Sequence, residues 1–407
     1  MTTATLSRPI PTDLATDKAR ISSIDLVRGI VMVIMALDHS RDYFHLGAFN
    51  YNPTDLTTTY PALFFTRWIT HYCAPAFVFL AGTSIYISSR KKSKQALSMF
   101  LLTRGLWLIV LEVVVIRFSF LFNFYYDVTF LQVIWVIGAA MVCMSALIHL
   151  PYMAILSMGA VLLIGHNATD GIQLNPGETG FALWAFIHQS GFVEITPGHS
   201  LFVVYPLIPW LAIMMLGYCI GRMYEKTFDP TQRLQILTRL GVSAILLFIV
   251  LRFSNFYGDP APWSEQKNMT FTLMSFLNTT KYPPSLLYSL MTLGPVLLLL
   301  AAFEKYNVGN TLKPFLVFGR VPLFYYILHF FLIHAISLVL FMNKTGRSFS
   351  EIDFHFSQSF GGITGEGGYS LGLAYLGWMA VVIALYPLCK WYNRYKSTHS
   401  HWWLSYL

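Results

Sequence analysis

The sequence predicts an all-α, polytopic integral membrane bundle of about ten transmembrane helices, or eleven, with both termini in the cytoplasm. The first observation is composition: 55% of the residues are hydrophobic and only 11% are charged. A soluble domain carries roughly 25% charged residues, so lipid must contact most of this surface. The second observation is a mean hydropathy of +0.55. The third is a succession of apolar runs of the length that a bilayer requires, about 20 residues each.

These apolar runs predict a single transmembrane domain over residues 21–396. It is flanked by a flexible cytoplasmic N-terminus, 1–20, and a cytoplasmic C-terminal tail, 397–407. The N-terminal segment is polar and lacks the apolar core of a cleavable signal peptide, so we expect the first span to be retained. The spans lie at roughly 23–45, 60–89, 97–118, 124–148, 151–166, 201–223, 235–254, 283–303, 314–341 and 371–391.

The direction of the spans follows from the lysine and arginine residues between them. Sixteen of these residues fall on the side that holds both termini, and four fall on the other. Positive charge favours the cytoplasmic side, which gives an N-in, C-in topology. The long polar loops at about 167–200, 255–282 and 342–370 then lie outside, which suggests recognition there. Although the net charge is +8, the basic residues form short clusters rather than a stripe, so no nucleic acid is expected as a partner.

The cysteines give no sign of a metal site or a disulfide. The chain has four cysteines, and each lies singly inside an apolar segment. Neither a CxxC pair nor a Cys/His spacing typical of metal ligands occurs. We therefore expect small buried thiols and no metal.

Ionisable residues in the first span predict a functional site, because buried charge is costly in a membrane. Arg28 and His39 are eleven residues apart, which places them on one helix face about 16 Å apart along the axis. Asp42 is within reach of His39, and a carboxylate that holds one imidazole nitrogen leaves the other as base or nucleophile. Asp38 is similarly placed for Arg41. The alternative is a wet helix end with satisfied ion pairs.

Other spans carry polar residues at similar depth. His71 and His329 predict a polar chamber in the outer half of the membrane, although each alone could be a hydrogen-bonded packing residue. Arg104 and Arg320 lie nearer the cytoplasm, where they and Arg28 could hold the phosphates of an anionic donor. Arg320 could equally be a topology anchor.

Several stretches resemble a known family, the bacterial DUF1624 family, which belongs with the catalytic domain of heparan-α-glucosaminide N-acetyltransferase. The resemblance begins at the Asp25, Arg28 and His39 motif of the first span and continues over most of the chain. The matching segments are 20–29, 37–39, 75–82, 131–132, 205–221, 276–285 and 319–329.

The resemblance implies a transmembrane acyltransferase of a bacterial cytoplasmic (inner) membrane. Acetyl-CoA would be the donor substrate on the cytoplasmic side, and a small carbohydrate or similar amine or hydroxyl compound would be the acceptor outside. The first-span Arg–His spacing is also similar to that of the membrane acyltransferase-3 family, in which this histidine is catalytic; that favours His39. In the human glucosaminide enzyme, an asparagine stands near the Asp38 position and the catalytic histidine lies further along, which leaves His45 as an alternative.

We expect His39, oriented by Asp42 or Asp38, to act as general base toward the acceptor, and a covalent acyl-histidine route stays open. The bilayer and acyl-CoA are the expected partners, and homodimerisation is left open. The phosphates of the donor would lie near Arg28 and Arg104. Further residues expected to bind the acceptor or the oxyanion are Arg41, His71, Lys281, Ser285 and His329.

A transporter or flippase for a small sugar or lipid-linked precursor is the alternative function. It would use the same buried charges as a proton relay. Transporters often contain internal repeats, and residues 1–200 and 201–407 show no convincing similarity, which counts against it.

Overall fold

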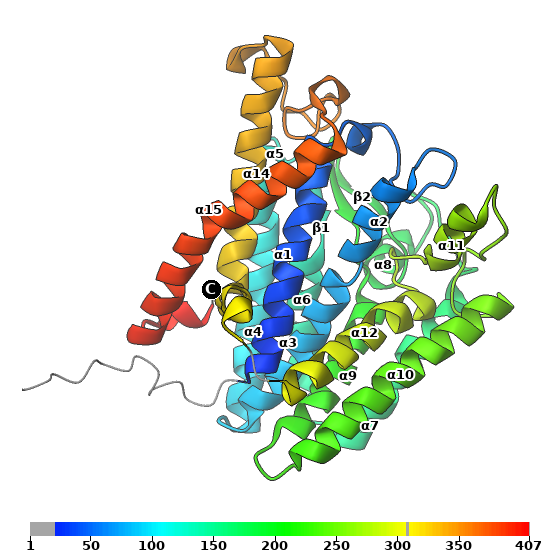
Figure 1. The fold of residues 1–407 in the computed structure, drawn as a ribbon, viewed down its shortest axis with the longest axis vertical. Coiled ribbons are helices and arrows are strands. Elements are labelled where there is room, and N and C mark those ends of the chain that lie inside the picture. Colours follow the sequence, from blue (N-terminus) through cyan, green and yellow to red (C-terminus); the bar gives the residue numbers. More distant parts are fainter. Residues whose placement is uncertain (1–20, 307–308, 407) are drawn as a thin grey trace, which may run out of the picture.

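A helical bundle surrounds α1 in the computed structural model, which describes residues 21–306 and 309–406. Figure 1 shows α1 in the middle of the molecule, crossed obliquely by the C-terminal helix α15. The helix α1 spans Ser22–Phe44, and α15 spans Leu371–Thr398. The predicted N-terminal segment 1–20 lies outside the described residues.

The remaining helices follow one another with short 3-10 turns and loops between them. They are α2 (Pro61–Thr70), α3 (Cys73–Ser89), α4 (Lys94–Leu111), α5 (Arg117–Leu121), α6 (Val133–Leu147), α7 (Tyr152–Gly165), α8 (Phe181–Ile187), α9 (Leu207–Gly221), α10 (Pro230–Ser254), α11 (Met269–Leu277), α12 (Leu286–Lys305), α13 (Lys313–Arg320) and α14 (Pro322–Thr345).

Eight helical segments within the described residues are long and apolar enough to cross a membrane. They coincide with eight of the ten predicted spans. The other two predicted spans correspond to α1 and α6. Helix α1 carries too many charged residues to count as an apolar span, and α6 is apolar but shorter than a span requires. Large apolar side chains point outward from the bundle: Val250 of α10 is 64% exposed and Ile383 of α15 is 72% exposed. Such faces require lipid, so the chain is a multi-pass membrane protein.

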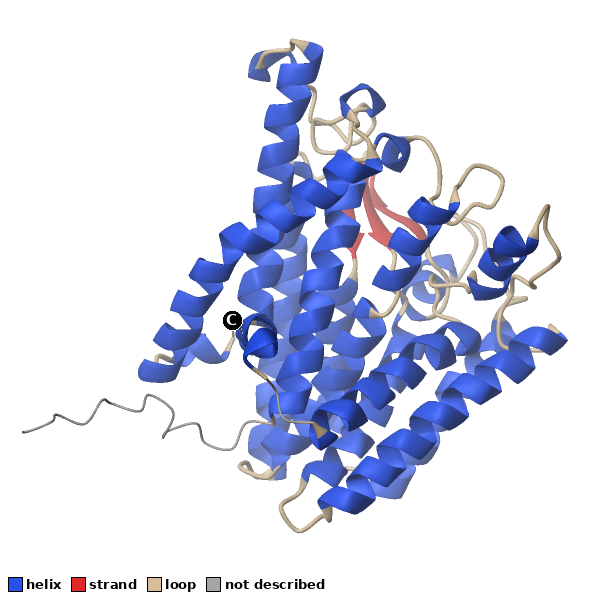
Figure 2. Ribbon diagram, viewed as in Figure 1, coloured by secondary structure: helices blue, strands red, loops and turns tan. Residues whose placement is uncertain are grey.

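The protein is mostly helical, as the sequence predicts, but it also contains a small three-stranded sheet that the sequence does not predict. Its strands are β1 (Val128–Leu131), β2 (Gly191–Thr196) and β3 (His199–Val203), in the order β1-β3-β2. Strand β3 pairs parallel with β1 and antiparallel with β2. The sheet lies at the end of the bundle where many of the loops gather (Figure 2). Two predicted spans, 124–148 and 201–223, therefore begin with strands; short apolar runs rich in β-branched and aromatic residues do not distinguish strand from helix.

Two other predicted spans are broken. The run 60–89 divides into α2 and α3 at His71 and Tyr72. The run 314–341 divides between α13 and α14 where Pro322 begins the new helix, as expected for proline at a first helical position. Helix α4 instead continues into α5 through a π-helical turn, Glu112–Ile116. The Glu112 carboxylate accepts hydrogen bonds from the backbone N–H groups of Gln132 and Trp135, so it caps α6.

The backbones of α1 and α13 touch at two glycines. A Cβ atom added to Gly29 would lie 1.8 Å from the carbonyl oxygen of Phe315, and one added to Gly319 would lie 1.8 Å from that of Asp25. Small residues let membrane helices approach this closely. The contact fixes the N-terminal half of α1, from which Arg28 projects.

We expect Gly29→Ala to lower the thermal midpoint of the purified protein, because the new methyl group forces α1 and α13 apart. Overpacking typically costs about 1–3 kcal/mol. Gly165→Ala is the matched control, since a Cβ there meets no atom within 4 Å. Equal midpoints for the two variants, measured by thermal unfolding in detergent, would contradict the close contact.

Candidate functional site

A cavity of about 530 Å³ lies at the C-terminal end of α1, under the sheet and the loops. We call it the histidine cavity. Helices α1 and α2, the residues at and after the end of β3, and the segment after α11 supply its polar wall, and aromatic residues close it. Its lining includes Asp38, His39, Arg41, Asp42, Arg67, Gln132, Phe202, Tyr205, Lys281, Tyr282, Tyr326, Phe356 and Phe360.

A buried ion network forms the polar wall. The Asp38 carboxylate is 2.9 Å from the Arg41 guanidinium and also pairs closely with Arg67 of α2. Arg67 donates a second hydrogen bond, of 3.3 Å, to the Tyr282 hydroxyl. Arg41 reaches in addition to Asp42. Asp38 is therefore engaged by two cations and links α1 to α2.

His39 faces the histidine cavity from α1. Its Nδ1 is 3.9 Å from the nearer carboxylate oxygen of Asp42, which is beyond hydrogen-bond length but close enough for an electrostatic effect. The His39 ring packs on Phe330, with centroids 4.1 Å apart, and lies 5.2 Å from the ring of His329. This aromatic packing holds the His39 ring in place beside the Asp42 carboxylate.

A second cavity, of about 330 Å³, lies beside the N-terminal half of α1. We call it the arginine cavity. Four cationic side chains line it: Arg28, Arg104, Arg320 and Lys396. Among these, Arg28 donates 3.0 Å hydrogen bonds to Asp25 and to Ser84. The rest of the wall is largely apolar, so the cavity suits a ligand with an anionic part and an uncharged part.

Three residues line both cavities: Phe77, Val133 and Tyr326. They belong to α3, α6 and α14, and Val133 and Tyr326 are buried. The two cavities are thus separated by single side chains rather than by a helix. We call these three residues the septum.

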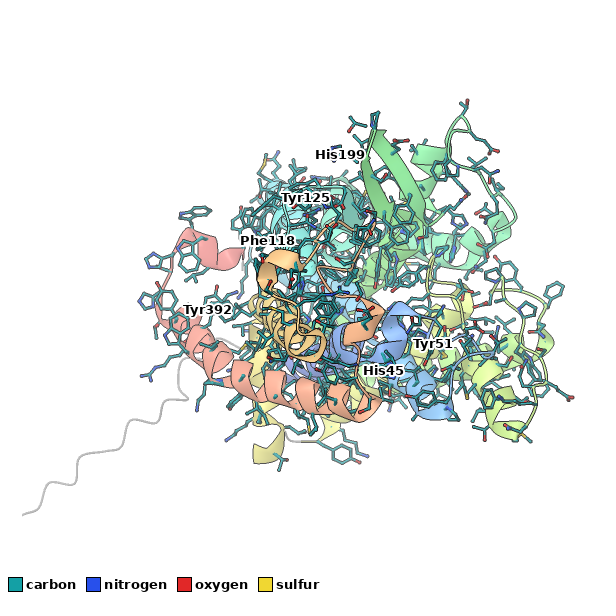
Figure 3. All side chains as sticks on the ribbon, turned by 90° about the horizontal axis from the view of Figure 1, so that it is seen from above. His45, Tyr51, Phe118, Tyr125, His199 and Tyr392 are labelled. Carbon is teal, nitrogen blue, oxygen red and sulfur yellow. The ribbon has the colours of Figure 1, made fainter. Side chains whose placement is uncertain are left out.

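His45 lies outside the lining of the histidine cavity. Its Nδ1 accepts a 3.1 Å hydrogen bond from the Gly47 backbone N–H, and its Nε2 is 3.3 Å from the Tyr60 hydroxyl. Figure 3 shows it close to Tyr51, in the segment after α1 and on the other side of the molecule from His199. These contacts hold the His45 side chain at the end of α1, outside the wall of the cavity.

Of the other predicted site residues, some line the histidine cavity and some do not. Lys281 lines the histidine cavity, and its ammonium lies 5.1 Å from the Tyr282 ring centroid. Ser285 caps α12, accepting from the Tyr288 N–H and donating to Asp259 at 2.6 Å. Neither Ser285 nor the buried His71 lines the cavity.

His329 lies behind His39. Its Nδ1 contacts the Tyr325 carbonyl at 3.1 Å, and the side chain is fully buried. It therefore supports the His39 ring from α14 rather than lining the cavity itself.

Sequence reasoning missed Arg67, Tyr282 and Lys396. Arg67 carries the same signal as the first span, a charge inside an apolar run, and it lies one helical turn before His71. The sequence pattern predicts for Lys396 only a role in topology, as one of the cations on the cytoplasmic side. Lys396 lies in the last turn of α15, and the oblique course of that helix brings it to the arginine cavity.

The fold and the site together define a multi-pass membrane protein with a buried charged chamber and, across a thin wall, a cationic cavity. The chain belongs to a family whose model, described as heparan-alpha-glucosaminide N-acetyltransferase, catalytic, matches residues 20–255. No curated protein matches the chain. The matched region contains His39, Arg67 and Arg104. Membership indicates a membrane-embedded, acetyltransferase-type activity.

We expect Arg67→Gln to destabilise the protein strongly, because it leaves Asp38 buried beside one cation instead of two. Removing one partner of a buried ion pair typically costs about 3–5 kcal/mol. The control is Arg347→Gln, whose partner Glu366 is 65% exposed, and which should change the thermal midpoint little. A comparable midpoint shift in both variants would show that the Asp38 network contributes no more than a surface pair.

Proposed function

We propose that the protein transfers an acetyl group from cytoplasmic acetyl-CoA to an amine or hydroxyl group of a sugar-like acceptor on the outer side of a bacterial inner membrane. The observation that carries this proposal is the septum. The arginine cavity and the histidine cavity share this thin wall. A group-transfer reaction between the two sides of a membrane needs such an arrangement.

The arginine cavity suits the donor. Coenzyme A combines a phosphate-rich nucleotide with a long, narrow, uncharged arm. Arg28, Arg104, Arg320 and Lys396 offer charge-assisted hydrogen bonds to phosphate, and the apolar remainder of the wall suits the arm. The thioester at the end of that arm would meet the acceptor near Tyr326, which lines both cavities.

The histidine cavity suits the acceptor and the chemistry. A nitrogen or oxygen lone pair of the acceptor attacks the thioester carbonyl carbon while His39 removes the proton from the attacking atom. The tetrahedral intermediate then expels the thiolate of coenzyme A, which takes the proton back from His39. Lys281 and Arg67 supply positive charge near the developing oxyanion. The aromatic side chains that close the cavity, Phe356 and Phe360 among them, limit competition from water.

The proposed orientation rests on the loop charges. The lysine and arginine clusters favour the N-terminal end of α1 on the cytoplasmic side. The arginine cavity, which contains Arg28, would then open toward cytoplasmic acetyl-CoA. The histidine cavity, under the polar loops, would open to the outside.

We expect His39→Asn to reduce acetyl transfer by about 10²–10⁴-fold, because a positioned general base contributes about that much. The assay measures coenzyme A release from acetyl-CoA with methyl α-D-glucosaminide as the acceptor probe. The matched control is His45→Asn, which should keep activity within a few-fold because His45 does not line the cavity. Loss in the His45 variant alone, with both proteins correctly folded, would transfer the catalytic role to His45.

An uptake assay with the same purified protein distinguishes transport from acyl transfer. Proteoliposomes receive labelled methyl α-D-glucosaminide without acetyl-CoA. Uptake in this condition, with no acetylated product when acetyl-CoA is added, would replace the acyltransferase proposal with the transporter alternative.

We expect Arg104→Gln to raise the KM for acetyl-CoA about 10-fold with a smaller change in kcat, because a hydrogen bond to a charged group is worth about 1.5–3 kcal/mol and 1.36 kcal/mol is a factor of ten. The control is Arg239→Gln on the exposed surface of α10. Initial rates at varied acetyl-CoA concentration provide both constants. An unchanged KM in the Arg104 variant would mean that the donor phosphates bind elsewhere.

A further inference from the structure

A second cluster of potential ligands lies apart from both cavities, beside the sheet. Its members are His166 and Asp170, in and after the 3-10 turn His166–Thr169 that follows α7, and His188, which ends α8. We propose that these three side chains bind one divalent transition-metal ion, Zn²⁺, as a structural site of the loop region. The proposal is independent of the acyltransferase function.

The distances fit a shared ion. One ligand atom from each of the three residues lies within 4.8 Å of the other two. His188 Nε2 and an Asp170 carboxylate oxygen are 3.2 Å apart. Ligands of a tetrahedral zinc ion, each at about 2.0–2.2 Å from the metal, lie about 3.3 Å from each other. The His188–Asp170 pair therefore already has the spacing of a tetrahedral edge, and the His166 ring needs only a small rotation or shift to complete three ligands.

Burial is the second, independent observation. His166 and His188 are only 5% and 2% exposed. Neither ring nitrogen of His166 has a hydrogen-bond partner among residues 21–306 and 309–406. A buried polar group without a partner typically costs about 1–3 kcal/mol, so native proteins rarely leave one. A metal ion in the cluster would use the free lone pair of His166.

The ligand types select the metal. Two imidazoles and one carboxylate suit zinc, which accepts nitrogen and oxygen donors and takes four ligands. Calcium and magnesium prefer six or more oxygen ligands, and this cluster offers one carboxylate. Three protein ligands leave a fourth position for water. Neighbouring groups support the set: the Asn167 side-chain amide donates a 2.7 Å hydrogen bond to the other oxygen of Asp170.

The position of the cluster indicates its role. It joins the end of α7 to the end of α8 and so closes the segment 166–188 into a compact loop. Asn167, which holds Asp170, also accepts a 2.8 Å hydrogen bond from the Leu286 N–H at the start of α12. Strand β2 begins at Gly191, soon after His188, and pairs with β3. A metal ion here would therefore brace the polar cover above the histidine cavity.

The expectation of no metal rested on the cysteines. The three ligands proposed here are histidines and an aspartate, with 3 and 17 residues between successive members. Only the turn after α7 and the return through α8 bring them together. His166 and Asp170 are four residues apart, a spacing that places two side chains on one side of a helical turn.

The test is metal content and metal affinity of the full-length protein, purified in detergent with a tag that lacks histidine. The chain is stripped with EDTA, given Zn²⁺ alone, and desalted; mass spectrometry then measures bound zinc. Wild type should hold about one equivalent per chain. Asp170→Asn and His188→Gln should each lose at least about 10-fold in affinity. Co²⁺ in the same site should give the visible absorption of a tetrahedral complex, which both variants should lack.

His199→Gln is the matched control, because His199 is an exposed histidine at the start of β3 and its substitution should leave zinc binding unchanged. Zinc should raise the thermal midpoint of wild type and of this control but not of the two ligand variants. The proposal is overturned if folded wild type binds no zinc at micromolar concentration, or if the ligand variants keep full stoichiometry and affinity. Acetyl transfer by metal-free protein would not affect this outcome, so the two proposals fail separately.

Discussion

The carboxylate of Asp38, held between the guanidinium groups of Arg41 and Arg67, is the interaction on which the site depends. A charge in a membrane-embedded bundle must be neutralised by close partners. Here the partners come from α1 itself and from α2, so the network attaches α2 to the last turns of α1. That attachment sets one wall of the histidine cavity. It also leaves the Asp42 carboxylate, which pairs with Arg41, beside His39.

A close contact between two helices complements this network at the other end of α1. The glycine contact between α1 and α13 brings Arg28 and Arg320 to the same carboxylate, Asp25. Consequently α1 carries positive charge near its N-terminal end, and it carries the Asp38 network and His39 near its C-terminal end. The sheet and the loops then cover the second of these regions, while α15 closes the first. Each cavity is thus built from elements far apart in the sequence but fixed to α1.

The parts of the structure that follow from local pattern could be predicted from the sequence. The first span was expected at 23–45 and is Ser22–Phe44, because its apolar length and flanking charges define it. Strand β1 could not be found in this way, since its pairing partner β3 lies about 70 residues further on. Likewise, spacing on a helix brought Asp42 to His39, but no helical spacing could show that Arg67 of α2 reaches Asp38. The family resemblance left His45 as an alternative, and only the structure shows that this side chain does not line the histidine cavity.

The thinness of the septum has an electrical consequence. Where two water-accessible cavities enter a membrane protein from opposite sides, the transmembrane voltage falls mainly across the low-dielectric material between them. In this protein that material would be the side chains of Phe77, Val133 and Tyr326. Moving one elementary charge through a full membrane potential of 100 mV changes its energy by about 2.3 kcal/mol. A reaction that shifts a proton or a thiolate across these three side chains would then be coupled to the energised state of the membrane.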